Sequence, residues 1–321
     1  MRRFVLGLIT IVMFAFVGLG LLGGMADAAY PERPITYVIA FNPGGESDIT
    51  ARAQQPYLEK ILGTQIIITY KIGGGGAVGW SEIVRTKPDG YTICGHNIPH
   101  IIVQPLQRKD TGYKTSDLKT VCWFQATPNI LVVPVNSPIK TLKDFVKYAK
   151  DHPGQVTLGG SGSYSANHLG TVEFNELAGI NTVYIPFTGS GDAVPALLGG
   201  HVSGLMTYTS MYISYKDQMR ALAVATDERL PLFPDVPTFK ELGYDYVEGA
   251  YRGICVPPKT PDEIVNKLAD AFRQVNETPQ FKEMMEKMGF QLVFYGPEES
   301  KKFIEERAEY YKDLMDKLAI K

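Results

Sequence analysis

The sequence predicts an α/β protein with two similar lobes, each built around a mainly parallel sheet. Short apolar segments alternate with segments of helical periodicity over residues 35–94, and the same alternation returns over residues 130–225, as expected of strands joined by crossover helices. Glycine- or serine-rich loops separate several strands from the helices that follow them. The chain has 321 residues, of which 45% are hydrophobic and 21% are charged, so it is long and apolar enough for two domains.

The N-terminus has the pattern of a secretory signal peptide. Arg2 and Arg3 precede an apolar run over residues 4–22, and residues 26–28 read Ala-Asp-Ala, the small-residue pattern that signal peptidase cleaves. We expect cleavage near residue 28 and an exported, periplasmic mature protein with no later membrane span. An uncleaved membrane anchor remains the alternative, because the apolar run is long enough to cross a bilayer.

The first lobe begins with elements that its apolar runs define. We expect strands over residues 35–41, 65–70 and 91–94 and helices over residues 49–62 and 77–86. Asp48 is placed to cap the first helix, and Gly63 follows its last turn. This order of elements predicts parallel strands with right-handed crossovers.

The second lobe repeats the pattern, and a helical region follows it. We expect strands over residues 130–135, 156–158, 182–185 and 221–225 and helices over residues 141–150, 167–177 and up to 199–200. Thr141 and Asp144 form a capping-box pattern at the start of the first helix. Three further helices, beginning near residues 260, 278 and 297, are expected to pack on one of the lobes.

Four of the loops between a strand and a helix share one property. They follow Phe41, Tyr70, Leu158 and Ile185, and each is rich in glycine or serine. The helix start after such a loop offers unpaired N–H groups and about half a positive charge, so together the loops predict a site for anionic oxygens. The alternative is that they are ordinary turns, which every such fold needs.

Three patterns of catalytic or metal chemistry are weaker. Residues 74–79 match G-x-G-x-x-G, but the acidic residue that a dinucleotide site needs about 20 positions later is missing. Ser163 and His168 could form a hydrolase pair, although no Asp lies close by to orient the histidine. His96 and His100 have the spacing of helical metal ligands without a carboxylate cluster to complete the set. We predict no catalysis, no cofactor and no metal, and keep a secreted serine hydrolase as the alternative.

The charges and cysteines narrow the partners further. The net charge is −2 with no stripe of Lys or Arg, which argues against a nucleic-acid partner. Cys94, Cys122 and Cys255 lack any C-x-x-C spacing. We expect three buried thiols, and one disulfide with a leftover thiol stays open.

Several side chains near the loops are candidates for ligand contact. Tyr164 and Phe187 lie just past expected strand ends, and Tyr208 follows an apolar segment. Arg252 is a lone cation in an apolar strand, so it needs a carboxylate from the protein or from a ligand.

As a set, these stretches resemble the solute receptors of tripartite tricarboxylate transporters, the TctC or Bug family. The resemblance lies in residues 30–35 (YPERPI), 41–45 (FNPGG), 87–92 (KPDGYT), 160–163 (GSGS), 196–200 (ALLGG) and 234–238 (PDVPT). It implies a type II periplasmic-binding-protein fold with a ligand cleft between lobes. Lobe 1 would comprise residues 29–129 and 226–321, and lobe 2 residues 130–225.

The resemblance also implies the function and partners. It implies a monomeric receptor that captures a small carboxylate and delivers it to the membrane permease of a tripartite transporter; a signalling protein as partner stays open. Arg252 is similar to the Trp-Arg-Gly version found in tricarboxylate receptors, which hints at a multiply charged ligand. His96 and Asn97 stand where the family often has small hydroxyl residues, which should alter selectivity.

The loops and the resemblance together give the expected ligand-binding residues. They are Asn42, Pro43, Gly44, Gly45, Asp48, Gly75, Gly76, His96 and Asn97 from lobe 1, Ser161, Ser163, Tyr164, Ser165, His168, Phe187 and Tyr208 from lobe 2, and Arg252.

Overall fold

The protein is described by a computed structural model that covers residues 30–318. The expected signal segment lies outside the described residues. Residues 33–318 fall within one compact unit, to which the following description applies.

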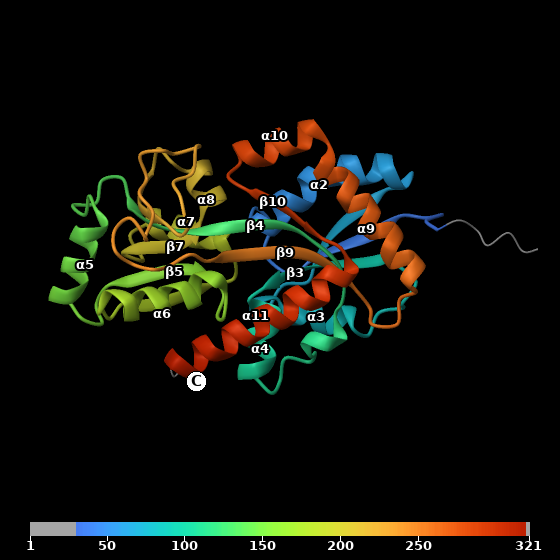
Figure 1. Cartoon of the computed structure of the whole chain (residues 1–321), viewed down its shortest axis with the longest axis horizontal. Helices are drawn as coiled ribbons and strands as arrows, with labels where there is room; N and C mark the ends of the chain where they lie inside the picture. The colour runs from blue at the N-terminus through green and yellow to red at the C-terminus, as the bar shows by residue number, and fades with distance from the viewer. Residues whose placement is uncertain (1–29, 319–321) are drawn as a thin grey trace, which may run out of the picture. The chain divides into compact units, whose positions relative to one another are not determined.

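The helices and strands of this unit alternate along most of the chain (Figure 1). The first half contains β1 (Ile35–Ile39), α2 (Glu46–Leu62), β2 (Ile66–Tyr70), α3 (Ala77–Ile83), β3 (Thr92–Ile98), α4 (His100–Gln107) and β4 (Lys119–Pro134). The middle contains α5 (Leu142–Asp151), β5 (Thr157–Ser161), α6 (Ala166–Ala178), β6 (Val183–Phe187), α7 (Ser190–Leu198), β7 (Gly204–Tyr208), α8 (Thr209–Ser214) and β8 (Met219–Val224). The last part contains β9 (Gly249–Val256), α9 (Asp262–Glu277), α10 (Pro279–Lys287), β10 (Gln291–Tyr295) and α11 (Pro297–Leu318).

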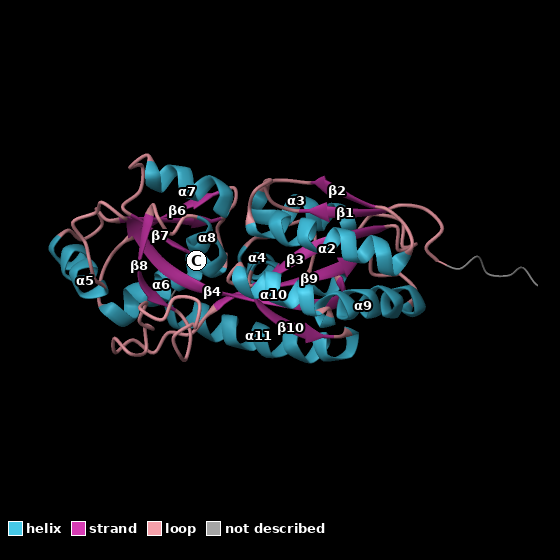
Figure 2. Ribbon diagram, turned by 90° about the horizontal axis from the view of Figure 1, so that it is seen from above, coloured by secondary structure: helices cyan, strands magenta, loops and turns pink. Residues whose placement is uncertain are grey.

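The strands form two parallel groups, which confirms the predicted fold class. β2, β1 and β3 are parallel neighbours, and β6, β5 and β7 form the second parallel group. Two antiparallel strands join the groups, in the order β3-β9-β4-β7. Figure 2 shows the long β4 running from one group of strands to the other.

β4 changes partners partway along its length. Lys119 to Pro128 pair with β9, whereas Asn129 to Val132 pair with β7 and Ile130 to Pro134 with β8. At the change, the Asn129 N–H donates to Glu248 O (3.0 Å) and its carbonyl accepts the Ala225 N–H (2.8 Å). The segments that connect the two groups therefore meet at Asn129.

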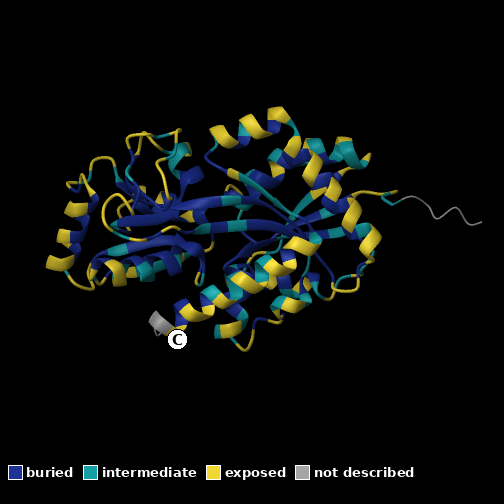
Figure 3. Cartoon of the chain, in the orientation of Figure 1, coloured by how far each residue is buried: buried dark blue, intermediate teal, exposed yellow. Residues whose placement is uncertain are grey.

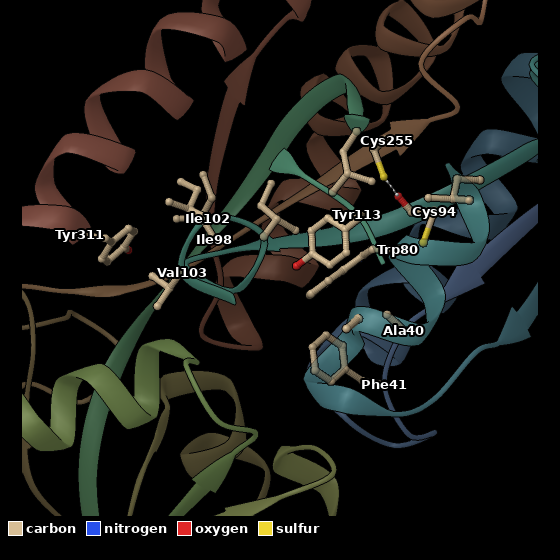
Figure 4. Close-up of a cluster of buried hydrophobic side chains, with 14 of the residues drawn as sticks. Ala40, Phe41, Trp80, Cys94, Ile98, Ile102, Val103, Tyr113, Cys255 and Tyr311 are labelled. Atoms are coloured by element: carbon tan, nitrogen blue, oxygen red, sulfur yellow. Dashed lines mark hydrogen bonds between the residues drawn. The ribbon is translucent and has the colours of Figure 1, made fainter. Parts of the chain in front are cut away.

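Each group of strands is buried between helices (Figure 3). Around β3, one apolar cluster gathers Trp80 of α3, Ile98, Ile102 of α4 and Tyr311 of α11, all at most 2% exposed (Figure 4). The second group has its own clusters, centred on side chains such as Leu158 and Leu205. The helices thus fix the carboxyl ends of the strands, from which the loops emerge.

The three cysteines are buried free thiols, as expected. Cys94 and Cys255 are register partners on β3 and β9, and the Cys255 thiol donates to the Cys94 carbonyl oxygen (3.5 Å). Burial raises the pKa of the Cys122 and Cys255 thiols. These thiols are therefore protonated core side chains rather than reactive groups.

The start of α2 differs from the prediction. The helix begins at Glu46, with Gly45 as the N-cap, instead of at residue 49 with Asp48 as the cap. Asp48 lies one turn inside, where its carboxylate accepts the N–H of Gly44 (2.8 Å). The predicted end is confirmed, because Gly63 caps α2 in the left-handed conformation (φ 68°).

Candidate ligand-binding cleft

The carboxyl ends of both parallel groups face one small cavity. Its volume is about 20 Å³, roughly the space of a single water molecule. The residues that line it come from both sides of the change in β4: Phe41, Gly45, Glu46, Ser47, Asn97 and His100 together with Arg252 on one side, and Ser161, Gly189, Ser190 and Tyr208 on the other. A ligand larger than water therefore requires the two groups to move apart.

Three helices begin at this cavity. α2 starts after Gly45, α4 starts at His100, and α7 starts after Gly189. The first N–H groups of a helix have no partner within it and carry partial positive charge. The cavity is therefore suited to the oxygens of an anion. Of the four predicted loops, those after Phe41, Leu158 and Ile185 contribute residues to its lining.

The glycine-rich loops bring the two sides into close contact. A Cβ on Gly191 would lie 3.3 Å from Gly44 C and Gly45 N. Beside this contact, Asn42 Nδ2 donates to Asp192 Oδ2 (2.5 Å). A side chain on Gly191 would therefore require the facing backbone to shift slightly.

The two sides also come close together at Gly162 and Gly75. A Cβ on Gly162 would be 3.5 Å from Gly75 Cα, and one on Gly75 would be 3.5 Å from Ser163 O. The loop that contains Gly75 therefore closes against the other side without lining the cavity.

At the cavity, side chains from the β5–β7 group of strands are held by a buried polar network. Ser161 Oγ donates to Asn167 Oδ1 (2.8 Å) and lies 3.2 Å from Tyr208 Oη. Asn167 in turn donates to Asn129 Oδ1 (3.0 Å). Burial raises the pKa of Tyr208 to about 12, so its hydroxyl keeps its proton at neutral pH and can donate to an anion.

His100 is the cavity residue with the greatest unused hydrogen-bonding capacity. Its side chain is 1% exposed, and neither ring nitrogen has a hydrogen-bond partner. The ring packs edge-on against Phe41 and Trp80. Burial, and secondarily the positive charge of Arg252, lower the pKa of His100 to about 3. At neutral pH the imidazole is uncharged and can offer one donor and one acceptor.

Arg252 pairs with a carboxylate of the protein itself. Its guanidinium forms an ion pair with Glu46, and its Nη1 donates to Thr127 Oγ1 (3.1 Å). The Tyr208 ring lies 4.9 Å from the guanidinium carbon. Glu46 also accepts a hydrogen bond from Ser210 Oγ (2.6 Å). Burial raises the pKa of Glu46, and the neighbouring Arg252 opposes that shift.

Other expected site residues have structural partners away from the cavity. Asp48 accepts hydrogen bonds from Arg52 Nε (2.9 Å) and Tyr70 Oη (2.6 Å). Ser165 caps α6, since its Oγ accepts the His168 N–H (3.1 Å). Gly76 has φ 98° and packs against Trp80.

The aromatic candidates and His96 are likewise placed by packing. His96 stacks on Trp123 with a centroid separation of 4.2 Å, and its burial lowers its pKa to about 3. It lies on β3 and borders a separate space of about 10 Å³. Phe187 packs beside the core of the second group, and Tyr164 has φ 61° in the loop before α6.

Ser163 and His168 do not form a catalytic arrangement in this structure. The Ser163 side chain is exposed. His168 Nδ1 accepts the backbone N–H of Tyr164 (3.0 Å), and the ring stacks on Tyr184. Burial lowers the pKa of His168 to about 4. The accepting nitrogen is thus occupied and cannot take a proton from a nucleophile.

Glu46, Ser190 and His100 line the cavity although we did not predict them as ligand contacts. Glu46 and Ser190 follow the glycines of two predicted loops, so their positions carried a signal. The sequence provided a weaker indication for His100, because Pro99 before it favoured a loop. In the structure, α4 begins at His100 itself.

Comparison with known proteins agrees with the fold. Residues 50–320 match the family model TctC, described as the tripartite tricarboxylate transporter family receptor. A Cupriavidus necator protein described as "UPF0065 protein in gbd 5'region" is 33% identical over 309 residues, covering 95% of this chain and 94% of the relative.

Solved structures of other proteins are similar to this chain in fold. The periplasmic binding protein BugD is 27% identical with a TM-score of 0.86, covering 91% of this chain and 99% of that chain. MatC from Rhodopseudomonas palustris with bound malate shares the fold at 24% identity, with a TM-score of 0.82 over 89% of this chain and 99% of that chain.

These matches also bear on the alternatives. The family is one of receptors, so the chain is not an enzyme and the hydrolase alternative loses its support. Among the described residues, none of the helices combines the length and apolar character needed to cross a membrane. The chain belongs to the tripartite tricarboxylate transporter family of receptors, TctC.

Proposed function

We propose that this protein is an exported receptor that captures a small organic carboxylate between its lobes and delivers it to the membrane permease of a tripartite transporter. The observation that carries the proposal is the small cavity at the carboxyl ends of the two parallel groups of strands. The starts of α2, α4 and α7 converge there beside the unpartnered imidazole of His100. In the related fold of MatC the bound molecule is malate, a carboxylate.

The lobes in this proposal are residues 29–129 with 226–321, and residues 130–225. The exchange of partners along β4 between Pro128 and Asn129 supports the first boundary. The hydrogen bond from Ala225 N to Asn129 O supports the second. Binding would draw the lobes together, because the closed form offers donors from both lobes to one carboxylate.

A thermal-shift panel of organic acids tests the binding step. At least one acid should raise the melting temperature of the mature protein, since a ligand that binds only the native state stabilises it. Isothermal titration calorimetry should then give one site per chain. If no organic acid binds, the proposal is wrong.

Transport needs its own experiment. Deletion of the gene in the source organism should abolish uptake of the best-binding acid at low concentration. Complementation with wild type should restore uptake, whereas complementation with a variant that cannot bind the acid should not. Unchanged uptake after deletion would contradict delivery to a permease while leaving the binding step intact.

A further inference from the structure

We infer that the Glu46–Arg252 pair makes this receptor select carboxylates with a single negative charge over di- and tricarboxylates. The inference rests on the proposed function and adds the charge class of the ligand. It differs from the expectation, drawn from the resemblance at Arg252, that the ligand is multiply charged.

The pair is built into the wall of the cavity. Both residues line the cavity. The side chain of Arg252 is 5% exposed, and that of Glu46 is 2% exposed. Thr127 Oγ1 accepts from Arg252, and Ser210 Oγ donates to Glu46 (2.6 Å). With these partners, the carboxylate stays on the guanidinium, where the second carboxylate of a ligand would otherwise bind.

The charge of the cavity follows from its lining. Among the residues that line it, Glu46 and Arg252 alone carry formal charge at neutral pH, because burial keeps His100 neutral. The lining therefore has a net charge of zero. One ligand carboxylate can be held by the partial positive charges of the helix starts.

A second carboxylate would meet a different environment. It would enter a partly buried space in which the cation is already neutralised and Glu46 supplies a like charge. At about 4 Å such a repulsion lowers affinity at least about fivefold, and more where water is excluded. An uncharged amide of the same shape avoids this repulsion and can still donate to Glu46.

Matched pairs of acids isolate this effect. Succinate, glutarate and adipate differ from succinamate, glutaramate and adipamate by one amide in place of one carboxylate. For each pair, calorimetry at pH 7.5 gives the ratio of the Kd of the diacid to the Kd of the monoamide. In the wild type we expect a ratio of at least about 5 for the best-fitting chain length.

Four proteins vary the cavity charge: wild type, Glu46→Gln, Arg252→Gln and the double variant. The formal charges of the lining become 0, +1, −1 and 0. The ratio should rise in Arg252→Gln, fall below 1 in Glu46→Gln, and fall below the wild-type value in the double variant, which lacks the Glu46 carboxylate. Circular dichroism and melting temperature verify that each protein is folded.

Glu46→Gln leaves Arg252 buried without its partner and is the variant most at risk of misfolding. If that variant does not fold, Arg252→Gln and the double variant provide the comparison, because they differ only in the charge of residue 46. The ratio should be lower in the double variant than in Arg252→Gln. The inference would be overturned if the wild type bound diacids more tightly than monoamides, or if the ratio did not change among the four proteins. Either result would leave the proposed function intact. Failure of every acid and amide to bind would overturn both.

Discussion

His100 offers the cavity a neutral donor and acceptor at the start of α4. We predict that His100→Leu weakens binding of the preferred acid about tenfold, because a buried hydrogen bond to the ligand contributes about 1–3 kcal/mol. Calorimetry measures the loss. His201→Leu, at an exposed position, is the control and should bind as the wild type does. Undiminished affinity in His100→Leu would remove the imidazole from the site.

The buried histidines also predict how stability depends on pH. Burial lowers the pKa of His96 and His100 to about 3, whereas an unfolded histidine titrates near 6.5. Between these values the unfolded chain binds more protons, so stability falls as the pH drops below about 6.5, by up to about 1.4 kcal/mol per pH unit for each histidine. Glu46 acts in the opposite direction, because its raised pKa adds stability as the pH falls through it.

Urea unfolding at pH 7, 6 and 5 measures this slope. His96→Asn should flatten it, since one proton-linked group is removed, and the exposed His201→Asn is the matched control. An equal slope in wild type and His96→Asn would show that the buried imidazole is not the group responsible.

Among the elements, we expect the two glycine loops at the starts of α2 and α7 to limit how far the proposed lobes close. We predict that Gly191→Ala lowers ligand affinity about fivefold. The added Cβ would lie 3.3 Å from the Gly44–Gly45 backbone, and overpacking of this kind costs about 1 kcal/mol or more. The melting temperature should change little, because the clash exists only in the closed form.

Gly95→Ala on β3, outside the cavity lining, is the control. Its Cβ would have no atom nearer than 3.6 Å, an ordinary contact, so it should close and bind as the wild type does. Equal affinities for the two variants would show that this backbone contact does not limit closure.

The sequence predicted the elements whose neighbours lie close in the chain. β1, β2, β5 and β6 are short apolar runs followed by turn residues, and the chain carries local helix caps such as Gly63 at the end of α2. β4 was expected only over residues 130–135. Its first part is mixed in polarity, and it becomes a strand because β9, more than a hundred residues later, pairs with it.

The same reasoning explains which parts of the site could be predicted. The loops after Phe41, Leu158 and Ile185 could be placed because carboxyl ends of parallel strands meet at one edge of a sheet. The partner of Arg252 could not, since Glu46 is about two hundred residues away and only the fold brings them together. Ser163 and Ser161 have similar loop positions in sequence, yet one is exposed and the other is buried.

For the whole protein, the proposed capture of a ligand requires two conformations. The cavity of about 20 Å³ is too small for an organic acid, so we expect the lobes to separate for ligand entry. The segments at Asn129, where β4, the end of β8 and the start of β9 meet, are placed to act as the hinge. Ligand binding would then shift the population toward closure.

Small-angle X-ray scattering of the mature protein, with and without a saturating acid chosen by calorimetry, tests whether the lobes close on the ligand. We predict that the radius of gyration falls when the acid is added, because contacts from both lobes favour the closed form. An identical scattering curve with calorimetrically proven binding would contradict capture at the seam between the lobes.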